Sequence, residues 1–188
     1  MRLIERLRSL WVRTEHPDQG LSKRRGRVCP WPKAYFVSSA VIDATHKHLR
    51  REGRRPCEGL VYWAGWYHDP VCIVTTALIP RGLNRWGGVR VPTGEMIRIG
   101  ELLRGLDLLI VAQIHTHPGD HGHSGGDDVN AVSSVPGFLS IVVPNFDQFD
   151  SLPLRRCYFH RYLGGGRWIE TTGSAAIDLI HIDPVRTS

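Results

Sequence analysis

The chain has no apolar run of the roughly 18–20 residues that a membrane-spanning helix requires. Its first thirteen residues, MRLIERLRSLWVR, carry charges throughout and lack the uninterrupted apolar stretch of a secretory signal. Cysteine is scarce, with no CxxC pair and four widely spaced residues, Cys29, Cys57, Cys72 and Cys157. This spacing favours reduced thiols over a disulfide framework or a cysteine-rich zinc knuckle. We therefore expect a cytoplasmic protein that does not enter a membrane.

The chain has an excess of positive charge, but it lacks the sequence motifs of nucleic-acid-binding proteins. The 188 residues include 24 Lys and Arg against 18 Asp and Glu, a net charge of +6, and the basic residues concentrate in 23–27 and 50–55. A basic balance can indicate a nucleic-acid partner. The sequence has no helix-turn-helix, Cys2His2 finger or aromatic RNA-binding motif. We interpret the basic runs as solvated surface and do not expect nucleic acid as the partner.

The first 32 residues differ in character from the rest. Residues 3–11 place five apolar side chains at helical spacing, with basic residues on the other side: Leu3, Ile4, Leu7, Leu10 and Trp11. Residues 14–32 are polar, basic and interrupted by proline. We predict an N-terminal amphipathic helix and basic arm over 1–32, followed by one domain over 33–188. Docking of the helix on its own domain is favoured over binding to a partner.

From residue 33 onward, strand-like and helix-like segments alternate. Helices are predicted over 40–52 and over 94–105, the second capped by Thr93, with a short helix from Asp127 or Asp128 to Pro136-Gly137. Residues 80–93 are predicted to form a loop, and Gly164-Gly165-Gly166 a hairpin turn rather than a phosphate loop. Strands are predicted over 34–39, 58–67, 71–79, 106–117, 138–144, 155–163, 167–171 and 175–182. The predicted fold class is mixed α/β, a central mixed sheet flanked by two longer helices.

The stretch QIHTHPGDHGHSGGDD, residues 113–128, concentrates potential metal ligands. His115 and His117 alternate on a predicted strand, so their side chains share one side and can reach one metal ion. His46 and His48 stand two apart on a predicted helix, where side chains diverge by about 200°. We interpret that second pair as surface or partly packed histidines, and the first pair as half of a zinc site.

A catalytic zinc site needs a third protein ligand and a general base. Aspartate is an accepted third ligand, and Asp120, Asp127 and Asp128 all follow the histidines. Asp120 lies on a glycine-flanked turn, whereas the other two begin the predicted short helix, and Ser124 could point its hydroxyl into the same cavity. Glu58, which opens a buried-looking strand, is the candidate base.

These residues together resemble a known family. Glu58, His115-Thr116-His117-Pro118 and Ser124-Gly125-Gly126-Asp127 resemble the signature E…HxHP…SxxD of the JAMM, or MPN-plus, metalloproteases, over roughly residues 34–183. EGLVYWAG and LSIVVP with the following asparagine are similar to neighbouring segments of bacterial members. The resemblance implies an MPN-like (cytidine-deaminase-like) fold and one Zn²⁺ per chain. It implies His115, His117 and Asp127 as ligands, Glu58 as the base and Ser124 as a stabiliser of the oxyanion.

One spacing departs from the family pattern. Five residues separate Pro118 from Ser124, where the family has six. If the register is counted from His117 instead, Asp128 falls at the ligand position and a glycine replaces the serine. Asp127 is favoured because it keeps both functional side chains. His121 and His123 are expected to line the loop and not to bind the metal.

The resemblance also implies a reaction. It points to an isopeptidase or peptidase that cuts after the C-terminal tail of a ubiquitin-like protein, in deconjugation or precursor processing. Bacterial members are associated with conjugation and antiphage systems, so activating and conjugating enzymes are the implied partners. The alternatives are processing of a sulfur-carrier protein or small peptide, and a non-catalytic MPN scaffold. Loop 80–93, with Arg81, Arg85 and Trp86, and segment 145–154 are the predicted walls of the substrate groove.

Overall fold

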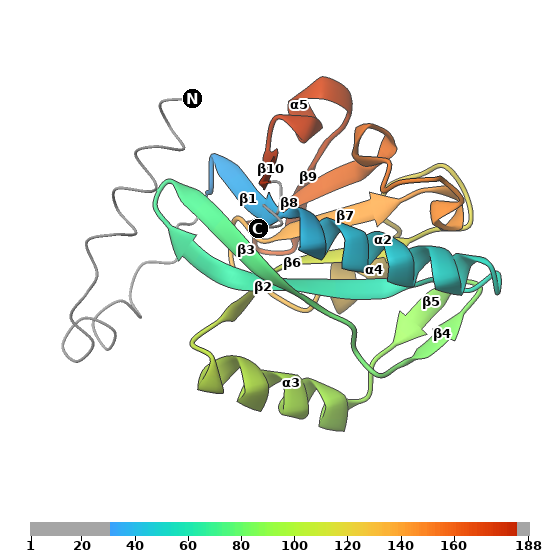
Figure 1. Cartoon of the computed structure of the whole chain (residues 1–188), viewed down its shortest axis with the longest axis horizontal. Helices are drawn as coiled ribbons and strands as arrows, with labels where there is room; N and C mark the ends of the chain where they lie inside the picture. The colour runs from blue at the N-terminus through green and yellow to red at the C-terminus, as the bar shows by residue number, and fades with distance from the viewer. Residues whose placement is uncertain (1–30, 184–188) are drawn as a thin grey trace, which may run out of the picture.

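The structure of the chain, a computed structural model, describes residues 31–183, with Val129 described by its backbone alone. The predicted N-terminal helix and nearly all of the basic arm lie outside these residues. One mixed sheet of eight strands forms the centre, in the order β10-β1-β3-β2-β6-β7-β8-β9 (Figure 1). Its strands are β1 (Ala34–Ser38), β2 (Leu60–His68), β3 (Val71–Leu78), β6 (Leu109–Thr116), β7 (Leu139–Val143), β8 (Tyr158–Gly164), β9 (Arg167–Thr171) and β10 (Ile180–Asp183).

The two longer helices, α2 (Ser39–Gly53) and α3 (Thr93–Gly105), pack on opposite faces of the sheet. Alternate residues of β2 separate the two faces, as the strand period of two requires. Val61 and Trp63 belong to the larger core, which includes Val41 and Leu49 of α2. On the other face, a smaller core joins β2 to α3 and consists of Tyr62, Ala64, Ile99 and Leu103. The mixed α/β architecture predicted from the sequence is therefore confirmed.

α2 is fixed on its face by polar contacts as well as apolar ones. Ser38 caps the helix by accepting a hydrogen bond from the backbone N–H of Val41. The Trp63 indole, fully buried, donates to the hydroxyl of Thr45 over 2.9 Å, and that hydroxyl donates to the Val41 carbonyl over 2.7 Å. A buried polar group with a partner avoids the penalty of desolvation. Because other placements of the helix would break these hydrogen bonds, they favour one packing position of α2 on β2.

The centre of the sheet brings the chemistry-bearing segments to one edge. β6 pairs antiparallel with β2, Leu60 opposite His115, and parallel with β7, His115 beside Val142. The carboxyl ends of β6 and β7 therefore lie at the same edge as the amino end of β2. Thr116 secures this edge, because its hydroxyl accepts the Gly59 N–H over 2.8 Å and its own N–H donates to the Gly59 carbonyl over 3.1 Å.

Several local predictions were wrong. The loop over 80–93 contains a hairpin of β4 (Leu83–Arg85) and β5 (Gly88–Arg90). Thr93 is the first residue of α3, and the capping position is Pro92, which makes no side-chain cap bond. The closing strand over 175–182 is a short helix, α5 (Gly173–Ile177), followed by β10; its apolar run fits a buried helix as well as a strand.

The short helix after the histidine-rich loop exists but is displaced. α4 (Gly125–Asn130) begins two residues before Asp127 and ends well before Pro136. The other strands and the glycine turn follow the prediction within a few residues, and Gly164, Gly165 and Gly166 all adopt the positive φ angles of a tight turn. Across residues 31–183, no helix combines the length and the apolar character needed to cross a membrane.

Candidate metal centre

His115 and His117 stand at the carboxyl end of β6, on the sheet face that also carries α3. Strand alternation puts His115 on the side of its partner Leu60, which packs against the smaller core. The backbone of His117 is held on both sides, because its N–H donates to the Val143 carbonyl over 3.0 Å and its carbonyl accepts the Phe146 N–H over 2.8 Å. Both histidines are buried, with exposed fractions of 5% and 3%. Their imidazoles are thus carried by rigid backbone.

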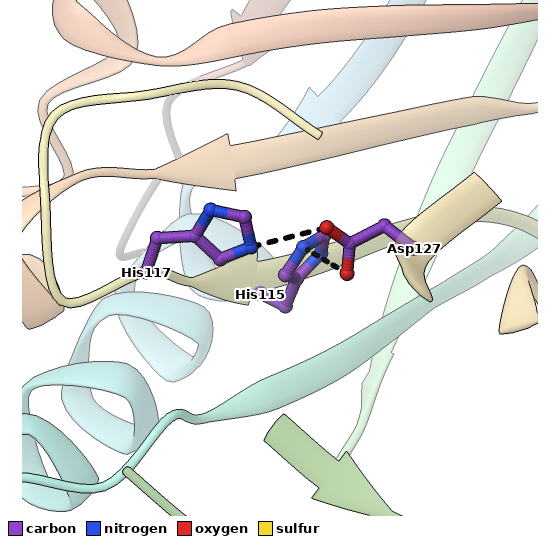
Figure 2. A group of neighbouring side chains, drawn as sticks. All are labelled: His115, His117 and Asp127. Atoms are coloured by element: carbon purple, nitrogen blue, oxygen red, sulfur yellow. Dashed lines mark ion pairs between the residues drawn. The ribbon is translucent and has the colours of Figure 1, made fainter. Parts of the chain in front are cut away.

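Asp127 reaches the two imidazoles from α4. Its Oδ1 lies 3.2 Å from Nε2 of His115, and its Oδ2 lies 3.2 Å from Nε2 of His117 (Figure 2). A capping box orients the carboxylate: Oδ2 accepts the backbone N–H of Ser124 over 2.6 Å and its hydroxyl over 2.8 Å. One nitrogen from each imidazole and one carboxylate oxygen lie within 4.8 Å of one another.

The donor set fits a metal ion. Three buried imidazole nitrogens lack a hydrogen-bond partner: Nδ1 and Nε2 of His115 and Nδ1 of His117. Nε2 of His115 faces the Asp127 carboxylate, yet the contact does not have hydrogen-bond geometry. Buried polar atoms are nearly always bonded, so an unbonded Nε2 of His115 that faces a carboxylate, with Nε2 of His117 beside the same carboxylate, indicates a ligand site. Two imidazoles and a carboxylate are donors that zinc accepts.

The other two aspartates are engaged elsewhere. The Asp128 carboxylate lies 2.8 Å from Nδ1 of His123. The Asp120 carboxylate accepts the hydroxyl of Tyr158 over 3.0 Å. Of the three aspartates considered from the sequence, Asp127 is the one that the structure places between the two histidines.

The electrostatics of Asp127 favour its ionised form. Burial alone would raise the pKa of this carboxyl, but the imidazoles of His115 and His117 beside it outweigh burial and hold the pKa well below its usual range. For His117, burial lowers the pKa, whereas Asp127, together with Glu58 and the backbone of His121, raises it with the larger combined effect. The aspartate is therefore a permanent anion at the position where a cation would bind.

Glu58 lies directly before β2, beside this cluster. Continuing the β2–β6 register by two residues from Leu60 and His115 places Glu58 opposite His117, on the same face. Its exposed fraction is 7%, and its N–H donates to the Arg85 carbonyl of β4 over 2.7 Å. Burial raises the pKa of Glu58 to about 7, with His117 lowering it and Asp127 raising it further. A carboxyl with that pKa can both accept and release a proton near neutral pH.

Ser124 has a structural position that the sequence did not indicate. It is the capping residue of α4, and its hydroxyl is committed to the Asp127 carboxylate. In this arrangement Ser124 orients the carboxylate, and its role at an oxyanion stays a prediction. Of the two interpretations given for His46 and His48, the packed one holds: His46 bonds the buried Asp147 over 2.8 Å, and His48 is buried.

The surroundings of the site offer two features that a substrate could contact. The β4–β5 hairpin adjoins Glu58 and exposes Leu83 and Trp86, at 57% and 66%. A hollow of about 390 Å³ lies at the carboxyl end of β7, with Asp120, Asn145 and Arg155 among its lining residues. Of the two predicted groove walls, loop 80–93 contains this hairpin and segment 145–154 contributes Asn145 to the hollow, and the groove itself stays a prediction.

Sequence reasoning missed the environment of His123. Its ring is stacked on His160 of β8 with centroids 3.7 Å apart, and it bonds Ser140 of β7. The pattern HGHS gave no signal of this packing, because histidines in a glycine-rich loop are ordinarily solvated. No sequence feature connected it to His160, 37 residues later.

A mixed α/β domain that presents two buried histidines and an aspartate at one sheet edge has the form of a metal-binding protein. The chain is 38% identical over 109 residues to "Probable metalloprotease y4jG" from Sinorhizobium fredii (strain NBRC 101917 / NGR234), an alignment covering 56% of this chain and 67% of that protein. The chain belongs to the same metalloprotease family. No family model matches it.

A solved structure resembles the fold. Protein DSY2949 from Desulfitobacterium hafniense, determined in solution, matches with a TM-score of 0.59 at 12% identity, over 80% of this chain and 93% of that one. At this identity the likeness concerns the fold alone. The family membership implies a metal-dependent peptidase, and the three residues that could hold its metal are His115, His117 and Asp127.

Proposed function

We propose that the chain is a zinc peptidase of the JAMM, or MPN-plus, type, cutting after the C-terminal tail of a ubiquitin-like protein in the cytoplasm. The observation that carries the proposal is the joint placement of four side chains at one sheet edge. His115, His117 and Asp127 converge there, and the buried Glu58 lies beside them. The signature spacing in the sequence is the second support, and the relationship to a probable metalloprotease is the third.

Zinc is the proposed metal. The donor set of two imidazoles and one carboxylate leaves a fourth coordination position open, which distinguishes catalytic from structural zinc sites. When bound, zinc supplies Lewis-acid chemistry, polarising a carbonyl and making water a better nucleophile. Asp127, held ionised by its neighbours, offsets part of the charge of the ion.

Glu58 is the proposed proton carrier. With a pKa of about 7, its carboxylate accepts a proton from the attacking water and then donates that proton to the nitrogen of the leaving amine. Because it is buried, the carboxyl is screened little by solvent and exchanges protons with the reacting groups in preference to bulk water. Ser124 contributes in one of two ways, by orienting Asp127 as it does here or by turning its hydroxyl to the oxyanion.

The substrate is proposed to lie along the β4–β5 hairpin. An extended peptide can add to an exposed strand through backbone hydrogen bonds, and this hairpin is bonded to Glu58 through the Arg85 carbonyl. Trp86 and Leu83 expose apolar surface beside it. The flexible tail of a ubiquitin-like protein can adopt the extended conformation that pairing with this hairpin requires. Activating and conjugating enzymes of a bacterial conjugation or antiphage system are the proposed partners.

The test uses linear and isopeptide-linked ubiquitin-like fusions as substrates. The wild-type chain, loaded with zinc, should release the free tail carboxylate. Glu58→Gln should keep the zinc content and lose cleavage by at least a hundredfold, because proton transfer contributes about 10²–10⁴. Glu101→Gln, on the exposed surface of α3, is the matched control and should cleave like wild type.

The alternatives give different results. Cleavage of small peptides or sulfur-carrier precursors alone would shift the substrate class while keeping the chemistry. Zinc binding without turnover on any of these substrates would indicate a scaffold and contradict the proposed enzyme. Cleavage that persists in Glu58→Gln would contradict the proposed base.

A further inference from the structure

His123 is bound on every side, although it belongs to a loop with glycines at 119, 122, 125 and 126. Its side chain is 5% exposed. Nδ1 lies 2.8 Å from the carboxylate of Asp128, and Nε2 lies 2.8 Å from the hydroxyl of Ser140 on β7. Glycine-rich backbone has little stiffness of its own, so this side chain supplies the fixed point of the loop.

The hydrogen bonds of His123 have one consistent direction. A carboxylate only accepts, so Nδ1 carries the proton and Nε2 accepts from the Ser140 hydroxyl. The Ser140 oxygen in turn accepts from Nε2 of Gln113 over 3.1 Å, and Oε1 of Gln113 accepts the Val132 N–H over 3.2 Å. The chain of donors runs from β6 through β7 to α4 with every step satisfied. Such a fully satisfied buried network specifies one arrangement.

The stack on His160 adds a second constraint. The two rings lie 3.7 Å apart at 12°, with Trp168 against the edge of His123 at 4.9 Å and 75°. The backbone N–H of His123 donates to Nε2 of His160 over 3.1 Å. Both the ring and the backbone of His123 are therefore attached to β8, which is part of the sheet that also carries His115.

The attachment brackets Asp127. His123 precedes Ser124, the capping residue whose N–H and hydroxyl hold the Asp127 carboxylate. It also bonds Asp128, the residue after Asp127. One side chain thus fixes the five-residue turn 124–128 at both ends, whereas α4 itself is six residues long and largely exposed.

We propose that His123 is a positioning residue, which holds the Asp127 carboxylate against His115 and His117 and thereby sets the affinity of the metal site. The proposal rests on the metal site of the proposed function, but not on the substrate or on turnover. It also accounts for the loop that is one residue short of the family spacing. A shorter path from Pro118 to Ser124 is held in place by an anchor on β7 and β8.

The test measures the dissociation constants of Co²⁺ and Zn²⁺ by competition with a chelator. His123→Ala should bind both metals 10–100 times more weakly, the range found when groups that orient metal ligands are removed. Asp128→Ala, an exposed substitution, should weaken binding about tenfold for the same reason. The double variant His123→Ala/Asp128→Ala should bind each metal at most about twofold more weakly than His123→Ala alone, because both residues act through one attachment. His68→Ala, at the exposed end of β2 away from the site, is the matched histidine-to-alanine control and should stay within about threefold of wild type.

Two further readouts separate positioning from general stability. The visible absorption of bound Co²⁺ reports its coordination geometry, so it should change in His123→Ala and stay as in wild type in His68→Ala. All titrations are made below the unfolding temperature of each metal-free variant, measured by circular dichroism. If His123→Ala does not fold, Asp128→Ala and Ser140→Ala carry the test, since each removes one end of the same attachment.

The outcomes distinguish the two proposals. Co²⁺ affinity and spectrum in His123→Ala and Asp128→Ala equal to those of wild type would overturn the positioning role and leave the proposed enzyme intact. Weakened metal binding together with absent cleavage in wild type would support the positioning role and contradict the proposed enzyme. A wild-type chain that binds neither Co²⁺ nor Zn²⁺ would overturn both.

Discussion

Two carboxylates of the site, Glu58 and Asp127, show how single residues acquire different roles from their surroundings. Both are largely shielded from solvent. Burial raises the pKa of Glu58 to about 7, whereas the neighbouring imidazoles of His115 and His117 outweigh burial and hold the pKa of Asp127 below its usual range. Environments that separate the pKa values of neighbouring acids are the pattern by which enzymes assign a proton carrier and a fixed anion.

The raised pKa of Glu58 predicts a pH-dependent stability in the metal-free protein. The folded state keeps the proton up to about pH 7, whereas the unfolded chain loses it near the ordinary value of 4.5. The contribution to stability is therefore complete below pH 4.5 and is lost as the pH rises through 7. At pH 8, Glu58→Gln should raise the free energy of unfolding by up to about 3 kcal/mol.

Urea unfolding of both proteins in a chelator, from pH 4 to pH 8, measures this effect. The two proteins should have similar stability at pH 4, where the glutamate is neutral in both states. A Gln variant with the same advantage at pH 4 and pH 8 would show that Glu58 does not titrate in this range.

Two aspartates near the histidines, Asp127 and Asp120, predict different effects on metal content. Asp127→Ala should leave well under one zinc per chain after dialysis, because the carboxylate between the imidazoles is removed. Asp120→Ala should keep about one zinc per chain, since its carboxylate is bonded to Tyr158 instead. Elemental analysis of the dialysed proteins decides. Equal zinc loss in both variants would contradict the ligand assignment.

At the scale of elements, the sequence predicted the helices and strands that have a persistent hydrophobic period. It missed or misplaced the short elements whose bounds depend on individual contacts. The two longer helices and the β2–β3 hairpin were found because amphipathic spacing and β-branched runs persist over many residues. The start of α4 was misplaced because Ser124 caps it from outside the acidic pair. The β4–β5 hairpin has three residues per strand, too short for a pattern to emerge.

Two glycines in helices predict opposite effects on stability. A Cβ on Gly53, the last residue of α2, would lie 1.9 Å from the Phe146 carbonyl oxygen, whereas one on Gly100 of α3 meets nothing within 4 Å. Gly53→Ala should destabilise the fold by about 1–3 kcal/mol or more through overpacking. Gly100→Ala should stabilise it by about 0.5–1 kcal/mol, because alanine loses less backbone entropy in a helix.

Thermal unfolding of Gly53→Ala and Gly100→Ala measures both changes in stability. Gly53→Ala is expected to have a second effect, on metal binding. Phe146 donates its N–H to the His117 carbonyl, so a displaced Phe146 disturbs the strand end that carries a predicted ligand. Gly53→Ala should therefore also weaken zinc binding, and Gly100→Ala should not. Unchanged stability in Gly53→Ala would show that α2 and the turn at Phe146 can move apart to accommodate the methyl group without loss of folding free energy, contrary to the prediction.

For the whole molecule, the identity of the site residues was accessible from the sequence and their geometry was not. Spacing placed His115 and His117 on one side of a strand, and the signature brought in Glu58 and Asp127. The distances depend on the parallel pairing of β6 with β7 and on the antiparallel pairing with β2, which bring together segments 57 residues apart. The anchoring of the loop on His160 depends on the sheet order, which no local pattern contains.

The metal is expected to stabilise the whole fold. A ligand that binds only the folded state at a hundred times its dissociation constant adds about 2.7 kcal/mol. For a chain of this size, that should raise the Tm by roughly 5–10 °C. Differential scanning calorimetry with increasing Zn²⁺ measures the shift, with Asp127→Ala as the control that should show little. A wild-type Tm independent of Zn²⁺ would mean that the site does not bind the ion in the folded state.

The site has a rigid wall, β6, which is paired on both edges, and a more movable wall, the short helix α4. Backbone amides of β6 should exchange with solvent only on global unfolding, since the strand lies in the middle of the sheet. The six-residue α4 has an exposed surface and is held to the sheet through His123, so it is the wall expected to open first. The rate at which metal leaves should therefore follow the fraying of that single turn, while the two imidazoles stay in place to receive the next ion.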